Sequence, residues 1–134
     1  MNATFKDALD SDYHVLLAEL MMTKYAEGKT VTWEELAALF SRRTGINWTW
    51  NLRLLCGAML RLDKAASDHH VFSALAIKTN GFPTKLFCER AIVIGLLKRG
   101  ASQSEKFLVW QAEFDYWVRR ARRHAALFKE TIRA

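Results

Sequence analysis

The chain has 134 residues, of which 51% are hydrophobic, and it contains five Trp and eight Phe. A chain of this length and composition can bury a core without disulfides or metal, which argues against an intrinsically disordered protein. No apolar run approaches the ~20 residues of a membrane span, and the opening MNATFKD is not a signal peptide. We therefore expect a single soluble, cytoplasmic domain over residues 1–134.

Positive charge is unevenly distributed along the chain, whose formal net charge is +6. Residues 1–70 carry eight Lys/Arg and nine Asp/Glu (net −1), whereas residues 71–134 carry twelve and five (net +7). Solubility requires only interspersed charges, so an excess confined to one half favours a surface for an anionic partner.

Two helices are expected in the first part of the chain. The capping run DSD precedes an apolar stripe that stops at Gly28, and glycine is a common helix end. After a short extended segment, Thr32 and Glu35 have the spacing of a capping box, which predicts the start of a second helix. Gly45 is the expected end of that helix.

A third helix is expected from residue 47 to residue 66, with Asn47 or Thr49 as its cap. Apolar residues at helical spacing mark its buried side: Trp48, Leu52, Leu55, Met59 and Leu62. Its other side carries Thr49, Arg53, Arg61 and Lys64. Trp48 and Trp50 point in different directions on a helix, and we expect Trp48 in the core. An exposed Trp here would suit base stacking or a protein contact.

The segment VFSALAI at 71–77 is the best strand candidate, because it is apolar on both faces and ends at the turn signal Asn80-Gly81. We expect this strand to be buried on both sides. Beyond Pro83, the apolar spacing predicts a short helix over 85–99 that ends at Gly100.

The last third of the chain predicts one long helix over 102–133. Apolar residues at intervals of three or four form a single stripe: Phe107, Trp110, Phe114, Trp117, Ala121, Ala125, Phe128 and Ile132. Beside this stripe lie four cations: Arg119, Arg120, Arg122 and Arg123. Asp115 can pair with Arg119 at i,i+4, but surplus charge remains, which favours an anionic partner at this helix.

The order of elements over 10–83 resembles the winged helix-turn-helix, with TWEELA at 32–37 opening its second helix and 47–64 as its recognition helix. The resemblance implies a mainly α fold: a three-helix core with one short strand pair, followed by the short helix and the long terminal helix. It places four residues at the major groove: Asn47, Thr49, Asn51 and Arg53. It places four more on phosphates: Arg42, Arg43, Lys78 and Lys85. Ordinary caps and a solvated face would explain the same residue types.

No catalytic motif stands out in the chain. Cys56, His69, His70 and Cys88 do not have the spacing of a structural zinc site. No spacing fixes Asp63, Asp68, His69, His70 and Glu89 on one face as a nuclease site would require. Both cysteines lie in apolar surroundings and are expected as free thiols of a reducing compartment. We therefore expect no enzyme activity, cofactor or metal.

Two functions remain, and they belong to different classes. The leading hypothesis is a small bacterial or phage protein that binds double-stranded DNA, such as a transcriptional or mobile-element regulator. It would read bases with the helix at 47–66 and use the terminal helix for phosphates, or for a homodimer on a two-fold site. The alternative is a non-catalytic protein-interaction module, an adaptor or inhibitor, that uses surface aromatic and Arg residues.

Overall fold

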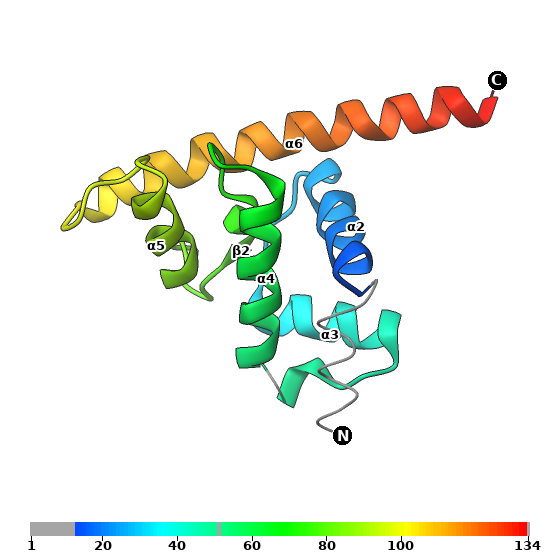
Figure 1. The fold of residues 1–134 in the computed structure, drawn as a ribbon, viewed down its shortest axis with the longest axis horizontal. Helices are drawn as coiled ribbons and strands as arrows, with labels where there is room; N and C mark the ends of the chain where they lie inside the picture. Colours follow the sequence, from blue (N-terminus) through cyan, green and yellow to red (C-terminus); the bar gives the residue numbers. More distant parts are fainter. Residues whose placement is uncertain (1–12, 51, 134) are drawn as a thin grey trace.

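The computed structural model describes the backbone of residues 13–50 and 52–133, and the side chains of 14–50 and 52–124 (Figure 1). The described chain is mainly helical, as predicted, with one short strand pair. In chain order its elements are α2 (Tyr13–Ala26), β1 (Val31–Thr32), α3 (Trp33–Thr44), the 3₁₀ helix η1 (Trp48–Trp50), α4 (Leu52–Ala66), the 3₁₀ helix η2 (Phe72–Leu75), β2 (Ala76–Ile77), α5 (Lys85–Val93) and α6 (Gln103–Arg133).

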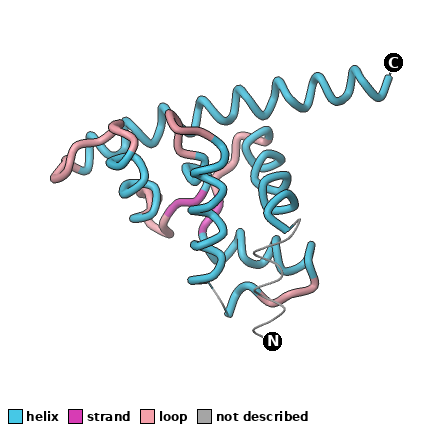
Figure 2. The backbone as a smooth tube through the Cα atoms, in the orientation of Figure 1, coloured by secondary structure: helices cyan, strands magenta, loops and turns pink. Residues whose placement is uncertain are grey.

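The long helix α6 runs along one side of the molecule, and α2, α4 and α5 stand against it (Figure 1). Helix α3 lies at the other end, away from α6, and η1 lies beside it. The strand pair sits between the helices near the centre of the fold (Figure 2). The N-terminus of α4 is therefore at the end distant from α6, whereas its C-terminus approaches α6.

The predicted start and end of the second helix are confirmed, whereas the cap predicted at residues 10–12 for the first helix lies outside the described residues. The Thr32 hydroxyl accepts a hydrogen bond from Glu35 N (3.2 Å), and Glu35 Oε1 accepts one from Thr32 N (3.2 Å), which is the predicted capping box. Gly45 ends α3 in the left-handed conformation (φ 74°), which an L side chain adopts only under strain.

The third helix differs from the continuous helix that we expect over 47–66. Residues 48–50 form the tighter η1, and α4 begins at Leu52. Trp48 explains the separate turn: its backbone N–H donates to Ser41 Oγ (2.8 Å) and its indole N–H to Thr44 Oγ1 (3.0 Å). Its ring is fully buried and lies 4.8 Å from that of Phe40, so the chain must bend to keep it there.

The prediction of a strand over 71–77 is wrong for most of that segment. Residues 72–75 form η2, and only Ala76 and Ile77 pair as β2. Burial on all sides is confirmed for 71–76. The backbone here forms hydrogen bonds with side chains instead of with a sheet. Two backbone N–H groups donate to carboxylates: Val71 N to Glu113 Oε1 (2.6 Å) and Ser73 N to Asp63 Oδ1 (2.7 Å). Three carbonyls accept from side chains: Val71 O from Trp117 Nε1 (3.0 Å), Phe72 O from the Tyr25 hydroxyl and Ala74 O from Trp110 Nε1 (2.7 Å).

The strand pair is parallel, with Val31 opposite Ala76 and Thr32 opposite Ile77. A tight turn follows β2, as Asn80-Gly81 predicts, because Gly81 N donates to Lys78 O (2.9 Å). An isolated antiparallel bridge then joins Ile77 to Pro83. The hairpin after β2 is thus reduced to a single bridge.

The later helices follow the expected order with one changed boundary. Helix α5 ends at Val93 instead of continuing to residue 99, because Gly95 takes a left-handed conformation (φ 85°) that breaks the helix. Helix α6 matches the expected span, and its stripe buries Trp110, Trp117 and Ala121.

Two residues of the predicted stripe are not fully buried. Phe114 is half-buried, and Phe107, which lies near the start of α6, is 39% exposed. The side chains of Ala125, Phe128 and Ile132 lie outside the described residues.

Replacing Tyr25 by Phe tests the role of the 71–75 segment. The variant keeps the buried ring but leaves the Phe72 carbonyl without its donor, so the free energy of unfolding should fall by about 1–3 kcal/mol. Tyr116→Phe is the control, because the Tyr116 hydroxyl is exposed and accepts only from Arg120. Urea denaturation measures both; equal losses in the two variants would contradict the role assigned to Tyr25.

Candidate nucleic-acid interface

The outward face of α4 carries only cations and small residues. Its exposed positions recur at helical spacing: Arg53, Gly57, Arg61, Lys64 and Ala65. The opposite face enters the core through Leu55, Met59 and Asp63, all fully buried. A Cβ placed on Gly57 would meet nothing within 4 Å, so the middle of this face is open to a close approach. We call the residues Arg53, Gly57, Arg61 and Lys64 the α4 stripe.

Helix α6 presents a second group of cations. Five of its residues line a shallow depression of about 630 Å³: Tyr116, Arg119, Arg120, Arg123 and His124. We call these residues the α6 arc. Arg120 is held in place, since its Nη1 donates to the Tyr116 hydroxyl (3.0 Å) and its guanidinium carbon lies 5.3 Å from the centre of the Trp117 ring.

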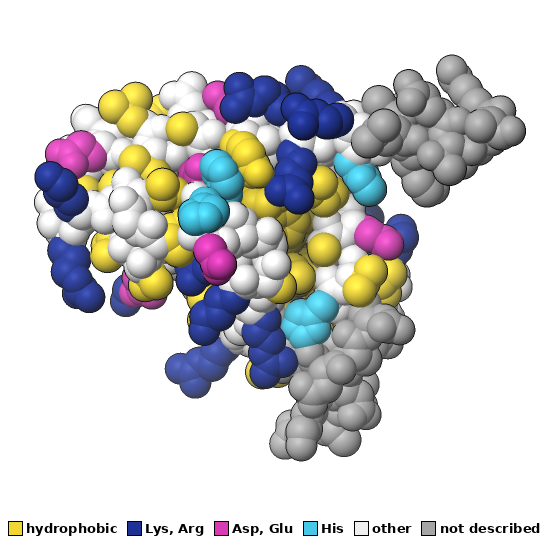
Figure 3. Space-filling model, turned by 45° about the horizontal axis from the view of Figure 1, so that its top comes forward, with side chains coloured by type: hydrophobic (Ala, Val, Ile, Leu, Met, Phe, Trp, Pro, Cys, Tyr) yellow, Lys and Arg dark blue, Asp and Glu magenta, His cyan; other side chains and the backbone are white. Residues whose placement is uncertain are grey.

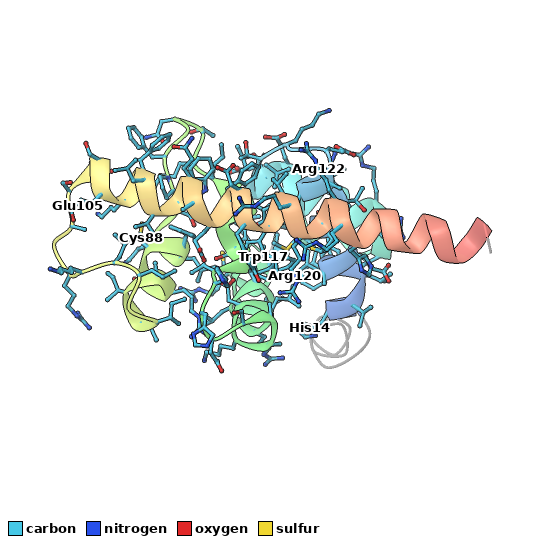
Figure 4. The ribbon with its side chains drawn as sticks, turned by 90° about the horizontal axis from the view of Figure 1, so that it is seen from above. His14, Cys88, Glu105, Trp117, Arg120 and Arg122 are labelled. Atoms are coloured by element: carbon cyan, nitrogen blue, oxygen red, sulfur yellow. The ribbon has the colours of Figure 1, made fainter. Side chains whose placement is uncertain are left out.

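Arg122 does not belong to this group, although the sequence places it in the same cluster. Arg120 and Arg122 project from opposite sides of α6 (Figure 4). Arg122 Nε donates to Ala26 O (3.1 Å) and so satisfies a carbonyl at the end of α2. Arg122 therefore joins α6 to α2, because its Nε–H is used in this hydrogen bond.

The ion pair expected between Asp115 and Arg119 does not form. Within residues 14–50 and 52–124, the ion pairs are Lys24 with Glu27, His70 with Glu113 and Lys85 with Glu89. The described carboxylates therefore do not neutralise the α6 arc, and its positive charge faces solvent.

The α4 stripe and the α6 arc occupy one face of the molecule. Figure 3 shows Lys and Arg side chains gathered along α6 and again lower down, over α4. Figure 3 also shows two neighbouring histidine side chains between these groups. The loop after α4 carries His69, which is exposed, and His70, which is half-buried and stacks on Tyr116 of the α6 arc. Asp68, also exposed, is the acidic residue next to them.

The other predicted contacts are scattered. Arg42 and Arg43 are exposed in the last turn of α3, at the end of the molecule away from α6. Asn47 and Thr49 are exposed around η1 and hydrogen-bond to each other, as in a local cap. Asn51 lies outside the described residues.

The other two residues predicted to contact phosphates, Lys78 and Lys85, lie on other parts of the fold. Lys78 is exposed in the turn after β2, and Lys85 pairs with Glu89 (3.7 Å) at the start of α5. The structure therefore brings Arg53 and the α6 cations to one face but does not gather the remaining predicted residues there.

Sequence reasoning missed three contributors to this face. Arg61 and Lys64 stand four and seven positions beyond Gly57 on the α4 stripe, and their shared helical spacing with Arg53 was the available signal. His70 is the third, and no local pattern marks it, because its partner Glu113 is 43 residues away.

The two neighbouring tryptophans have opposite environments. Trp48 is fully buried, as predicted, whereas Trp50 is 85% exposed at the tip of η1. An exposed Trp offers a large apolar ring and one N–H donor, and Trp is enriched at protein interfaces.

The candidate enzyme sites considered from sequence are not assembled. In the described part of the chain, no group of three or more His, Cys, Asp or Glu is placed to hold a metal ion. Glu89 pairs with Lys85, and Asp63 is buried against Ser73 N. Burial raises the pKa of the Cys56 and Cys88 thiols, so both are neutral at physiological pH.

Comparison of the chain with family models, curated proteins and solved structures finds no match. Among the described residues, no helix combines the length and apolar character needed to cross a membrane. The function of the chain therefore has to be argued from the geometry of its own residues.

Asp63 gives a stability prediction that separates a structural carboxyl from a functional one. Burial raises its pKa from 3.8 to about 6, although the hydrogen bonds from Ser73 and the Arg90 charge lower it. The folded protein thus holds this proton more tightly than the unfolded chain, and stability falls as the pH rises through about 6.

Asp63→Asn should therefore gain about 2–3 kcal/mol of unfolding free energy relative to the wild type between pH 4 and pH 7. Urea denaturation at several pH values measures this gap. Asp68→Asn, which removes an exposed carboxyl from the next loop, is the matched control. A gap between the wild type and Asp63→Asn that does not change with pH would contradict the prediction.

Proposed function

We propose that this protein binds double-stranded DNA through the face formed by the α4 stripe and the α6 arc. The observation that carries the proposal is that every exposed position of α4 is a cation or a small residue. A helix that enters the major groove needs such a face, because cations approach phosphates and base edges, while carboxylates would be repelled.

The dimensions of α4 suit this role. Its 15 residues give a length of about 22 Å, and the major groove, about 12 Å wide, admits one α-helix. Gly57 would allow the helix axis to come close to the groove floor at its midpoint. Arg53 lies about one turn before that point, where its guanidinium can pair with guanine in two hydrogen bonds.

In this pose, the α6 arc would contact the phosphates beside the groove. The α6 arc lies near the end of α4, because its member Tyr116 stacks on His70 in the loop that follows α4, so the arc extends the same positive surface. The order of α2, α3 and α4 around a small strand pair agrees with the proposed winged-helix likeness, with the wing reduced to the bridge between Ile77 and Pro83.

A two-fold DNA site would require a homodimer. We propose the C-terminal part of α6 as the dimer contact, because its backbone continues past α2 and away from the body of the protein (Figure 1). The partner copy would then place a second α4 along the same duplex.

The double variant Arg53→Ala/Lys64→Ala tests the α4 stripe. Each phosphate contact contributes about 0.9 to the slope of log affinity against log salt, so loss of the Lys64 contact should lower the slope by about 1, while loss of Arg53 removes a base contact. Duplex affinity at low salt should fall by about tenfold or more. Fluorescence anisotropy of a labelled duplex at several salt concentrations measures both quantities.

Lys98→Ala/Arg99→Ala is the matched control. It also removes two exposed cations, but from the turn before α6 and outside the proposed face. Equal effects of the two double variants would mean that net charge alone governs binding. The absence of duplex binding by the wild type at low salt would overturn the proposal.

Trp50 favours a second candidate function, a protein-interaction module. An indole that is 85% exposed beside Arg53 has the composition of an interface hot spot. Such a contact depends on apolar burial and is weakened little by salt, unlike binding to phosphates.

Trp50→Ser should leave the free energy of unfolding within about 0.5 kcal/mol of the wild type, because the ring is exposed. If the second candidate is right, a partner retained by the wild type at high salt is lost by this variant. Leu108→Ser, at another exposed apolar residue, is the control and should retain the partner. Retention by Trp50→Ser would exclude Trp50 as the anchor.

A further inference from the structure

His70 lies between the two basic groups and is held by a buried carboxylate. Its Nδ1 is 3.0 Å from Glu113 Oε2, and the Glu113 side chain is only 7% exposed. The other Glu113 oxygen accepts from Val71 N (2.6 Å), which fixes the carboxylate in place. Glu113 thus holds the imidazole with its Nδ1 directed at the carboxylate.

The stacking of its ring fixes the orientation of His70. The imidazole is parallel to the Tyr116 ring, with the ring centres 3.6 Å apart and an angle of 5° between the planes. The Trp117 ring meets it edge-on at 6.4 Å. Because the Tyr116 hydroxyl also accepts from Arg120, one contact chain joins Glu113 to the α6 arc.

The second nitrogen of His70 faces solvent. The His70 side chain is 32% exposed, and its Nε2 is not a buried nitrogen that lacks a hydrogen-bond partner. With Nδ1–H donating to Glu113, Nε2 accepts hydrogen bonds in the neutral ring and donates one in the imidazolium. Protonation therefore adds a positive charge and an outward N–H donor between the α4 stripe and the α6 arc.

The surroundings of His70 contain few other charges. From α6 come Glu113 and Arg120, and the loop that carries His70 adds Asp68 and His69. From α5, Arg90 donates to Ser67 O (3.3 Å) three residues earlier, and α4 ends nearby with Asp63 and Lys64. Of these groups, Glu113 is the one that contacts the imidazole directly.

We propose that His70, as an imidazolium held by Glu113, is a further DNA contact that donates from Nε2 to a backbone phosphate. This inference rests on the proposed function and deepens it, because it links the phosphate contacts of α4 and α6 and makes duplex binding stronger at lower pH. Histidine is suited to this because its charge changes between about pH 5 and pH 8.

The test compares duplex affinity at pH 6 and pH 8 at constant salt, using the full chain and a labelled duplex. The wild type should bind about three- to tenfold more tightly at pH 6, as expected for one added charge-assisted hydrogen bond. His70→Gln should lose most of this ratio. His69→Gln should keep most of it, because this side chain is exposed and is not the histidine that pairs with a carboxylate among the described residues.

A measurement on the wild type guards against structural damage in His70→Gln. The ¹⁵N resonances of the imidazole, followed by NMR at pH 6, should show a shift of the His70 Nε2 signal when duplex is added. Binding with the same pH ratio in His70→Gln as in the wild type, or an Nε2 signal unmoved by duplex, overturns this inference alone. No duplex binding at either pH overturns the proposed function as well.

Discussion

The fold depends on the way the buried 71–75 segment satisfies its backbone hydrogen bonds. Among the described residues, the strand ladder available to this region is the two-residue pairing of β1 with β2, so most of its N–H and C=O groups need other partners. Side chains from three helices supply them: Tyr25 from α2, Asp63 from α4, and Glu113, Trp110 and Trp117 from α6. A buried polar group without a partner is costly, so each helix must present these residues inward.

This constraint also determines what the surface displays. Because Asp63 must reach Ser73 N, α4 is rotated so that Arg53, Gly57 and Lys64 face solvent. On α6, the inward positions of Glu113 and Trp117 leave the α6 arc pointing outward on the side where α4 ends. The requirements of the core thus align two groups of cations that are more than fifty residues apart in the chain.

The same buried contacts lead directly to the proposed binding face. Glu113 serves the core through Val71 N and the surface through His70, and the ring of His70 stacks on Tyr116, which in turn accepts from Arg120. A charged face that is positioned by core hydrogen bonds is rigid, which lowers the entropy cost of binding an extended polyanion. Arg122 shows the opposite use of a cation, since it ties α6 to the end of α2.

Local patterns in the sequence determined the helices, the capping box at Thr32, the glycine ends, the buried Trp48 and the apolar stripe of α6, because each depends on residues within a few positions of one another. Tertiary structure decided the rest. Segment 71–77 has a strand-like composition, yet distant side chains capture its backbone and wind it into η2. The cluster 119–123 is continuous in sequence but splits around the helix, and His70 meets Glu113 and Tyr116 of α6 only in space. The composition therefore predicted a basic surface. Which residues form that surface depends on hydrogen bonds between residues more than forty positions apart.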